Sequence, residues 1–238
     1  MTPPVPLHIG IVGCSAEGAA LCFRTICAEG AARLGGHAHP EVSLHTPSLA
    51  DYIRCLDAGD RQGVADLMLA SARKLAAAGA DFLVCPDNTI HQAWDLVAPR
   101  SPLPWLHIAQ VVAQAAGQRG LRRVGVLGTA WLVRSEVYPQ ALGARGIEAV
   151  RPSDADRALV DRIIMDELVP GTVRPASTAQ LVGVIARLRA TGCDAVALAC
   201  TELPLALHDG NAPLPLLDST RLLARAALDR SLGARTTP

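Results

Sequence analysis

The sequence lacks the features by which several large classes of protein are recognised. Its 22 basic residues are balanced by 22 acidic ones and form no basic run, so we expect neither a nucleic-acid partner nor binding to an anionic membrane surface. No apolar run reaches the roughly 18 uncharged residues of a transmembrane helix. The Thr/Pro-rich start has neither the basic nor the apolar region of a signal peptide. These absences predict a cytoplasmic protein.

The motifs of the common cofactors and metals are missing as well. The seven cysteines contain no C-x-x-C pair and the seven histidines no H-E-x-x-H motif, so we expect no metal. Gly10-x-x-Gly13 and Gly125-x-x-Gly128 are too short for a dinucleotide fingerprint. The one lysine, Lys74, lies in a predicted helix, which argues against a pyridoxal-phosphate Schiff base. We expect no cofactor, and we interpret most cysteines as reduced, small core residues.

An internal repeat is present instead. Three segments recur in the same order, at offsets of 192 − 79 = 113, 124 − 9 = 115 and 214 − 103 = 111 residues. The paired segments are Gly79–Thr89 with Gly192–Glu202, Ile9–Cys14 with Val124–Thr129, and Leu103–Leu106 with Leu214–Leu217. Three matches in order indicate a duplication of about 110 residues.

The repeated segments are short apolar runs separated by helical patterns, which predicts an α/β fold with a mostly parallel sheet in each half. The predicted helices are 16–33, 60–78, 108–118, 134–142, 155–168, 178–191 and 220–232. We expect two pseudo-symmetric lobes, the first formed by residues 1–107 plus 217–238 and the second by 108–216. Ligands of such sheets bind beyond the carboxyl ends of the strands, so we expect the active site in the cleft between the lobes.

Two chemically active groups occupy matched strand ends, Asp87 in the first copy and Cys200 in the second. A cysteine thiolate can accept a proton or attack carbon, although a buried structural thiol is the commoner role. An aspartate can donate a proton when its environment raises its pKa, although Asp87 could equally cap the helix that follows it. The pair predicts acid–base chemistry by two opposed groups.

Polar residues around these ends could bind a substrate. Asn88, Thr89, Thr129 and Thr201, with backbone N–H groups at helix starts, could hold a carboxylate. His91 could orient the substrate or Asp87, or be a structural hydrogen-bonding residue. Glu202 could hold a substrate ammonium or cap a helix. No arginine clamp is evident, because Arg54 is equally explained by a solvated helix face.

Taken together, these motifs resemble the aspartate/glutamate racemase superfamily, in particular its aspartate racemase branch. The resemblance rests on Ile9–Gly13 with Ser15 and Glu17, on Asn88-Thr89-x-His91, on Arg123–Thr129 and on Cys200-Thr201-Glu202, and it covers nearly the whole chain. It implies cofactor-independent racemisation by two opposed cysteines in a homodimer, and it adds Ser15 to the substrate-binding residues. The sequence departs from the pattern at Asp87, where the family usually has cysteine, and Cys85 lies two residues too early to replace it.

Three hypotheses follow. The first is an amino-acid racemase or epimerase acting on aspartate, glutamate or a related amino acid. The Cys200 thiolate would remove the α-proton and Asp87, as an acid, would return one to the other face, with the roles swapped for the opposite enantiomer. The second is a superfamily reaction that uses cysteine differently, namely decarboxylation of a malonate-type acid or cis–trans isomerisation of a maleate-type acid. The third is a non-catalytic pair of lobes that binds a ligand.

Overall fold

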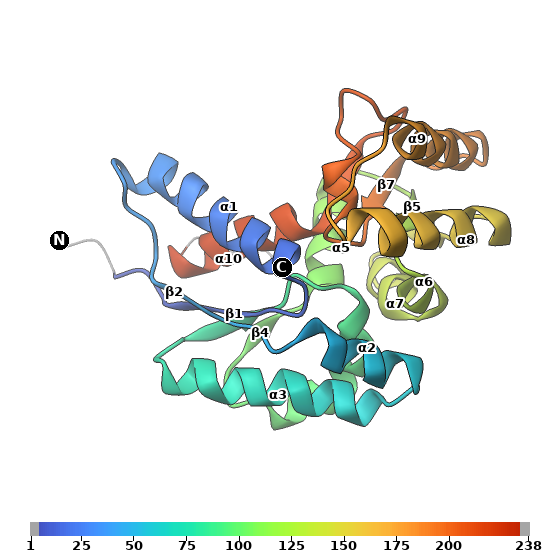
Figure 1. Ribbon diagram of the computed structural model, residues 1–238. Helices are drawn as coiled ribbons and strands as arrows, with labels where there is room; N and C mark the ends of the chain where they lie inside the picture. The colour runs from blue at the N-terminus through green and yellow to red at the C-terminus, as the bar shows by residue number, and fades with distance from the viewer. Residues whose placement is uncertain (1–4, 234–238) are drawn as a thin grey trace. The chain divides into compact units, whose positions relative to one another are not determined.

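The structure is a computed structural model that describes residues 5–233. The described chain divides into two compact units. The first contains the residues up to Ile108 and those from Thr220 onward, and the second is Ala109–Ser219. Each unit contains one four-stranded sheet in which every strand pair is parallel (Figure 1).

The first unit has the strand order β2-β1-β3-β4. Its strands are β1 (Ile9–Val12), β2 (Val42–His45), β3 (Phe82–Val84) and β4 (Trp105–Leu106). Its helices are α1 (Ala16–Leu34), α2 (Leu49–Asp57), α3 (Arg61–Ala77), the 3₁₀ turn η1 (Thr89–Ala93), α4 (Trp94–Val97), the 3₁₀ turn η2 (Ala98–Arg100) and, at the end of the chain, α10 (Ser219–Ser231).

The second unit repeats this order as β6-β5-β7-β8. Its strands are β5 (Arg123–Leu127), β6 (Glu148–Val150), β7 (Ala195–Leu198) and β8 (Leu216–Asp218). Its helices are α5 (Ile108–Gln118), α6 (Ala130–Arg134), α7 (Val137–Gly143), α8 (Asp154–Ile163), the π-helical turn η3 (Ile164–Leu168), α9 (Pro175–Ala190) and the 3₁₀ turn η4 (Leu203–Leu205).

The predicted α/β architecture of two parallel sheets is confirmed, and each repeated segment occupies the same place in its own sheet. The edge strands β2 and β6 escaped the sequence analysis because their residues are only partly buried and form no continuous apolar run. The helix expected over 134–142 is present as α7, but it begins at Val137, three residues later than predicted. The chain breaks at Ser135, whose side chain and N–H both bond to the Leu132 carbonyl, and Arg151 donates to the carbonyls of Val133 and Ser135.

The C-terminal helix α10 packs within the first unit, beside α1 (Figure 1). Arg225 pairs with Glu29 at 2.9 Å, and Arg33 pairs with Asp229 at 2.5 Å. The Arg230 guanidinium lies 4.8 Å from the centre of the Phe82 ring on β3. On the other side of the sheet, α3 covers β1 and β3 with an apolar cluster whose fully buried members include Met68, Leu69, Leu75 and Leu83.

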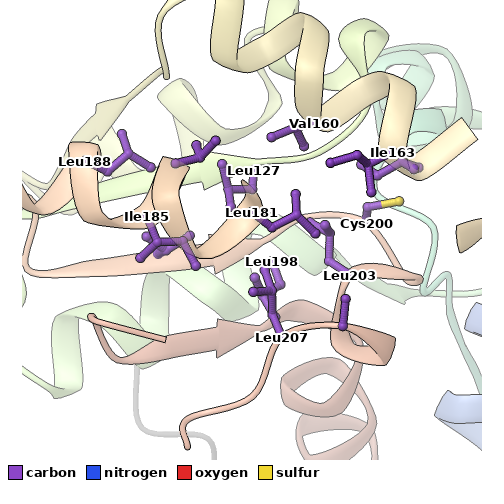
Figure 2. Close-up of a cluster of buried hydrophobic side chains, with 14 of the residues drawn as sticks. Leu127, Val160, Ile163, Leu181, Ile185, Leu188, Leu198, Cys200, Leu203 and Leu207 are labelled. Atoms are coloured by element: carbon purple, nitrogen blue, oxygen red, sulfur yellow. The ribbon is translucent and has the colours of Figure 1, made fainter. Parts of the chain in front are cut away.

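The core of the second unit is a cluster of aliphatic side chains from α8, α9 and the strands (Figure 2). Leu181, Val184 and Ile185 of α9 are fully buried in it. Cys200 lies at one end of this cluster, among Ile163 and Leu203. The packing therefore supports the loop that carries the candidate catalytic cysteine.

The Gly-x-Asp part of the repeat has a structural role in both units. Gly79 and Gly192 follow α3 and α9 with φ of +89° and +87°. This left-handed conformation ends a helix and favours glycine, which has no Cβ to clash with the backbone. Each turn delivers an aspartate, Asp81 or Asp194, to the start of the neighbouring strand.

The two aspartates make equivalent hydrogen bonds. In the first unit Asp81 N–H donates to the His8 carbonyl at 2.9 Å, and His8 N–H donates to Asp81 Oδ2 at 2.7 Å. In the second, Asp194 N–H donates to the Arg123 carbonyl at 2.8 Å. The N–H groups of Arg122 and Arg123 donate to Asp194 Oδ2 at 2.7 and 2.9 Å. These bonds set the register with which β1 and β5 enter their sheets. None of the helices in residues 5–233 has the length and hydropathy needed to span a membrane.

The Asp194 hydrogen bonds predict a pH-dependent loss of stability in Asp194→Asn. The Arg122 and Arg123 N–H groups lower the pKa of Asp194, so its contribution is complete above the unfolded-state pKa of about 3.9 and is lost as the pH falls below it. We expect Asp194→Asn to lower the free energy of unfolding by about 1 kcal/mol at neutral pH, since the site is exposed. Urea unfolding should show this difference shrinking toward pH 3, and Asp166→Asn, at another exposed position, should show none. A loss that stays constant with pH would contradict the assignment.

Candidate functional site

Asp87 connects two strand ends of the first unit. Its Oδ2 accepts the Cys14 N–H at 3.0 Å and its Oδ1 accepts the Ser15 N–H at 3.1 Å. Ser15 is also the N-cap of α1, with its Oγ accepting the Gly18 N–H at 3.1 Å. The carboxylate therefore lies at the positive end of a 19-residue helix, where an anion is favoured. Two N–H donors and the helix dipole both favour the ionised form of Asp87.

The groups around Asp87 are neutral. Burial, followed by the charge of Asp87, raises the pKa of the Cys22 thiol to about 12. The same two causes raise the pKa of Cys85 well above its ordinary value. Burial raises the pKa of Tyr52 too, whose hydroxyl has no hydrogen-bond partner among the described residues. The interpretation of Cys85 as a core residue agrees with its complete burial.

His91 holds the backbone of Asp87. Its Nδ1 lies 2.9 Å from the Asp87 carbonyl oxygen, and because a carbonyl can only accept, Nδ1 carries the proton. Its ring contacts His107 edge-on at a centroid distance of 4.6 Å, and Trp94 packs against both histidines. Of the roles that the sequence left open for His91, the geometry favours the orientation of Asp87.

Both imidazoles are electrically neutral in this environment. Burial lowers the pKa of His107 to about 4. Burial and the neighbouring His107 lower that of His91 well below its ordinary value. His91 Nε2 is buried without a partner in the described part of the chain, so a proton added there would meet no acceptor. Across residues 5–233, no three His, Cys, Asp or Glu side chains are grouped to bind a metal ion.

In the second unit, the loop after β7 brings a thiol and a carboxylate together. Cys200 Sγ donates to Glu202 Oε2 at 2.9 Å, and Thr201 Oγ1 donates to the same oxygen at 2.7 Å. Cys200 is 8% exposed and Glu202 4% exposed. Sequence reasoning assigned Glu202 to a substrate ammonium or to a helix cap. It did not foresee a contact with Cys200, because their spacing of two residues does not reveal the fold of the loop.

Thr129 lies beside this loop within the second unit. Its Oγ1 accepts the Leu132 N–H at 3.4 Å as the N-cap of α6. The preceding Gly128 passes so close to β7 that a Cβ there would lie 2.9 Å from the Ala199 carbonyl oxygen. Only glycine permits this approach of the loops after β5 and β7. The fold thus places Thr129 and the Cys200 loop at neighbouring strand ends.

Three further residues considered in the sequence analysis are Asn88, Thr89 and Arg54. Asn88 is buried and Thr89 half-buried at the start of η1, and the Asn88 side chain, at the N-cap position, makes no cap bond. The Asp87 carboxylate, which the sequence offered as a cap for the helix after it, binds the loop after β1. Arg54 is exposed and pairs with Asp51 three residues earlier, as a solvated helix face predicts.

A pocket of about 530 Å³ between α6 and α8 is lined by charges of both signs beside Ala130, the residue after Thr129. Its charged residues are Arg134, Arg157, Arg162, Asp154, Asp161 and Asp166. Asp161 Oδ1 accepts the Ala130 N–H at 2.7 Å, which ties α6 to α8. The sequence shows the charges on α8 at helical spacing, but their position beside Thr129 follows only from the packing of α6 against α8.

The buried histidines predict that the protein becomes less stable in mild acid. Because their pKa values are lower in the folded state than the unfolded value of about 6.5, the unfolded chain binds more protons below that pH. For one such group, lowering the pH from 7 to 5 costs about 2 kcal/mol of unfolding free energy. His91→Asn keeps a donor near the Nδ1 position and removes one titrating ring. We expect its unfolding free energy to fall less than that of the wild type over this pH range in urea titrations.

The exposed residue His37 provides the control, and His37→Asn should follow the wild-type pH dependence. If His91→Asn lost as much stability as the wild type on acidification, the assignment of His91 as a buried neutral group would be wrong.

Comparison with known proteins identifies the family of this chain. The sequence signature of the family described as Asp/Glu/hydantoin racemase matches residues 11–227. The broad-specificity amino-acid racemase RacX of Bacillus subtilis is 25% identical over 173 residues, which cover 73% of this chain and 74% of that protein.

Solved structures of racemases and of a racemase homologue share the fold of this chain. A candidate Asp/Glu racemase from Yersinia pestis is 32% identical, with a TM-score of 0.87 over 95% of this chain and 99% of that chain. An aspartate racemase homologue from Pyrococcus horikoshii, PH1733, is 25% identical, with a TM-score of 0.81 over 94% of this chain and 98% of that chain. Glutamate racemase from Francisella tularensis, solved with D-glutamate, shares the fold at 14% identity, with a TM-score of 0.70 over 99% of this chain and 86% of that chain. With a family signature spanning most of its length and two repeated parallel sheets, this chain belongs to the Asp/Glu/hydantoin racemase family.

Proposed function

We propose that this protein is an amino-acid racemase or epimerase that works without a cofactor and moves the α-proton with Asp87 and Cys200. The observation that carries the proposal is that the matched ends of β3 and β7 bear a carboxylate that accepts two backbone N–H groups and a thiol in contact with a second carboxylate. Membership of the family and the similarity to RacX support the reaction class.

The reaction is an exchange of one proton for another at Cα. Asp87 removes the α-proton as a base, and the electron pair left on carbon is delocalised into the substrate carboxylate. Cys200 then donates its thiol proton to Cα, and inversion requires that this proton arrive on the other side of the carbon. Product release leaves Asp87 protonated and Cys200 as a thiolate, and solvent restores the starting state. The opposite enantiomer uses the two groups in reversed roles.

The carbanion is the costly species, because the α-proton of an amino acid is a very weak acid. Hydrogen bonds to the substrate carboxylate stabilise the developing charge, and they do so best when the donors are fixed in advance. We assign this task to Asn88, Thr89, Thr129 and Thr201, together with backbone N–H groups at the helix starts. In this proposal the substrate is aspartate, glutamate or a related amino acid, and the protein acts as a homodimer.

One observation favours a second function. The Asp87 carboxylate is engaged by two backbone N–H groups, so it could be structural and leave Cys200 as the one proton donor. The protein would then decarboxylate a malonate-type acid. Loss of CO₂ leaves the electron pair on the adjacent carbon as an enolate, and the Cys200 thiol protonates that carbon. Release of CO₂ from a malonate, without inversion of any amino acid, would establish this alternative.

The racemase proposal predicts deuterium incorporation at Cα. In D₂O, both enantiomers of the substrate should exchange the α-proton and appear as the deuterated opposite enantiomer, as measured by NMR and chiral chromatography. Asp87→Asn and Cys200→Ala should each slow inversion by about 100-fold or more, the usual contribution of an acid–base group. Asp87→Cys, which restores a second thiol, should invert faster than Asp87→Asn.

The control is Cys193→Ala. Cys193 is a buried thiol of the same unit that hydrogen-bonds Thr191 rather than Glu202, and its loss should leave the inversion rate unchanged. Absence of exchange with every common amino acid, in a protein that is folded by circular dichroism, would refute the proposal.

A further inference from the structure

Glu202 and Cys200 form a buried thiol–carboxylate pair whose protonation can be deduced from its neighbours. Oε2 of Glu202 accepts two hydrogen bonds, one from Cys200 Sγ at 2.9 Å and one from Thr201 Oγ1 at 2.7 Å. A contact of this length between a thiol sulfur and a carboxylate oxygen requires a shared proton. Because a carboxylic acid is ordinarily a much stronger acid than a thiol, we assign that proton to sulfur. Cys200 is a neutral thiol in this arrangement.

The first unit shows the opposite state at the matched position. Both oxygens of Asp87 accept backbone N–H groups, from Cys14 and Ser15. Backbone N–H groups can only donate, and two such donors stabilise a carboxylate more than a carboxylic acid. These donors favour the ionised form of Asp87, whereas the Glu202 carboxylate favours the protonated form of Cys200.

We propose that Glu202 is a positioning residue that keeps the proton on Cys200, so that the resting enzyme presents a base at Asp87 and an acid at Cys200. This inference rests on the proposed racemase function for its meaning in catalysis, but the state of the thiol can be measured without substrate. The physical cause is local. A thiolate next to the Glu202 carboxylate would bring two negative charges together in a buried loop and would lose the S–H···O hydrogen bond.

Under this proposal, the resting protonation state suits one direction of the reaction and not the other. The enantiomer that yields its α-proton to Asp87 meets the resting enzyme ready to react, since the proton to be delivered is already on sulfur. The other enantiomer needs a thiolate at Cys200 and a proton on Asp87, the state that Glu202 and the two N–H groups oppose. A pair of identical cysteines would not by itself impose this difference.

The closing experiment measures the thiol state of Cys200 in the full-length, substrate-free protein. Only the thiolate is nucleophilic, so alkylation by iodoacetamide at pH about 8, close to the ordinary thiol pKa of about 8.5, reports the thiolate fraction. Peptide mapping by mass spectrometry resolves each cysteine. We expect iodoacetamide to alkylate Cys200 about 10-fold faster in Glu202→Gln than in the wild type, because the adjacent negative charge is gone. The partly exposed Cys27 and Cys55 serve as internal references and should not change.

Glu167→Gln is the matched control. Glu167 is also a buried glutamate of the second unit, 3% exposed, and accepts from the Ser177 hydroxyl at 2.6 Å, but it hydrogen-bonds no thiol. Its neutralisation should leave Cys200 alkylation at the wild-type rate. The ultraviolet absorbance of the Cys200 thiolate is measured as wild type minus Cys200→Ala and as Glu202→Gln minus Glu202→Gln/Cys200→Ala. A larger thiolate absorbance in the second difference shows that a faster alkylation rate reflects ionisation of Cys200 and not easier access to the loop.

Unchanged or slower alkylation of Cys200 in Glu202→Gln would overturn the proposal, and a slower rate would make Glu202 the base that ionises the thiol. Steady-state kinetics add an independent test. A positioning role lowers kcat in Glu202→Gln with KM nearly unchanged, whereas a glutamate that binds the substrate ammonium raises KM, which would contradict our assignment. If Cys200 alkylates as expected but no amino acid exchanges in D₂O, the racemase function fails while the role of Glu202 in holding the thiol proton stands.

Discussion

The structure at the strand ends of this protein requires that buried polar groups have hydrogen-bond partners. In a parallel sheet the loops at each strand end carry backbone groups that the ladder does not satisfy, and a buried group without a partner is costly. Aspartate and glutamate side chains supply the partners here. Asp81 and Asp194 bind the backbone where β1 and β5 begin, and Asp87 binds the loop that leaves β1.

The hydrogen-bond partners at the ends of β3 and β7 differ, and they give the two candidate catalytic groups different electrostatic environments. At the end of β3, N–H donors surround Asp87 and stabilise a negative charge. At the end of β7, the acceptor is Glu202, and the donors available to it are the Cys200 thiol and the Thr201 hydroxyl. A carboxylate surrounded by donors stays ionised, and a thiol facing a carboxylate stays protonated. The duplicated fold thus places a carboxylate and a thiol in unlike environments at its two matched positions.

The surroundings of Asp87 keep this assignment well defined. His91 and His107 remain neutral because they are buried, and the thiols of Cys22 and Cys85 keep their protons for the same reason. These four groups around Asp87 therefore stay neutral near pH 7. His91 contributes by holding the Asp87 carbonyl, a task for which a neutral imidazole with its proton on Nδ1 is sufficient.

The sequence by itself determined the fold class, the internal repeat and the identity of the residues at the strand ends, because apolar runs, helical periodicity and Gly-x-Asp turns are local patterns. It could not reveal the edge strands β2 and β6, which are half-buried and carry no apolar run, nor the break at Ser135, which depends on an arginine 16 residues away. Only the tertiary structure decided which polar groups meet. The bonds from Cys14 and Ser15 to Asp87 join residues more than 70 positions apart, and the Cys200–Glu202 contact depends on the fold of its loop. Charge state follows from such contacts, so the sequence named the candidate acid–base pair, and the proposed location of the resting proton rests on the contacts of the folded chain.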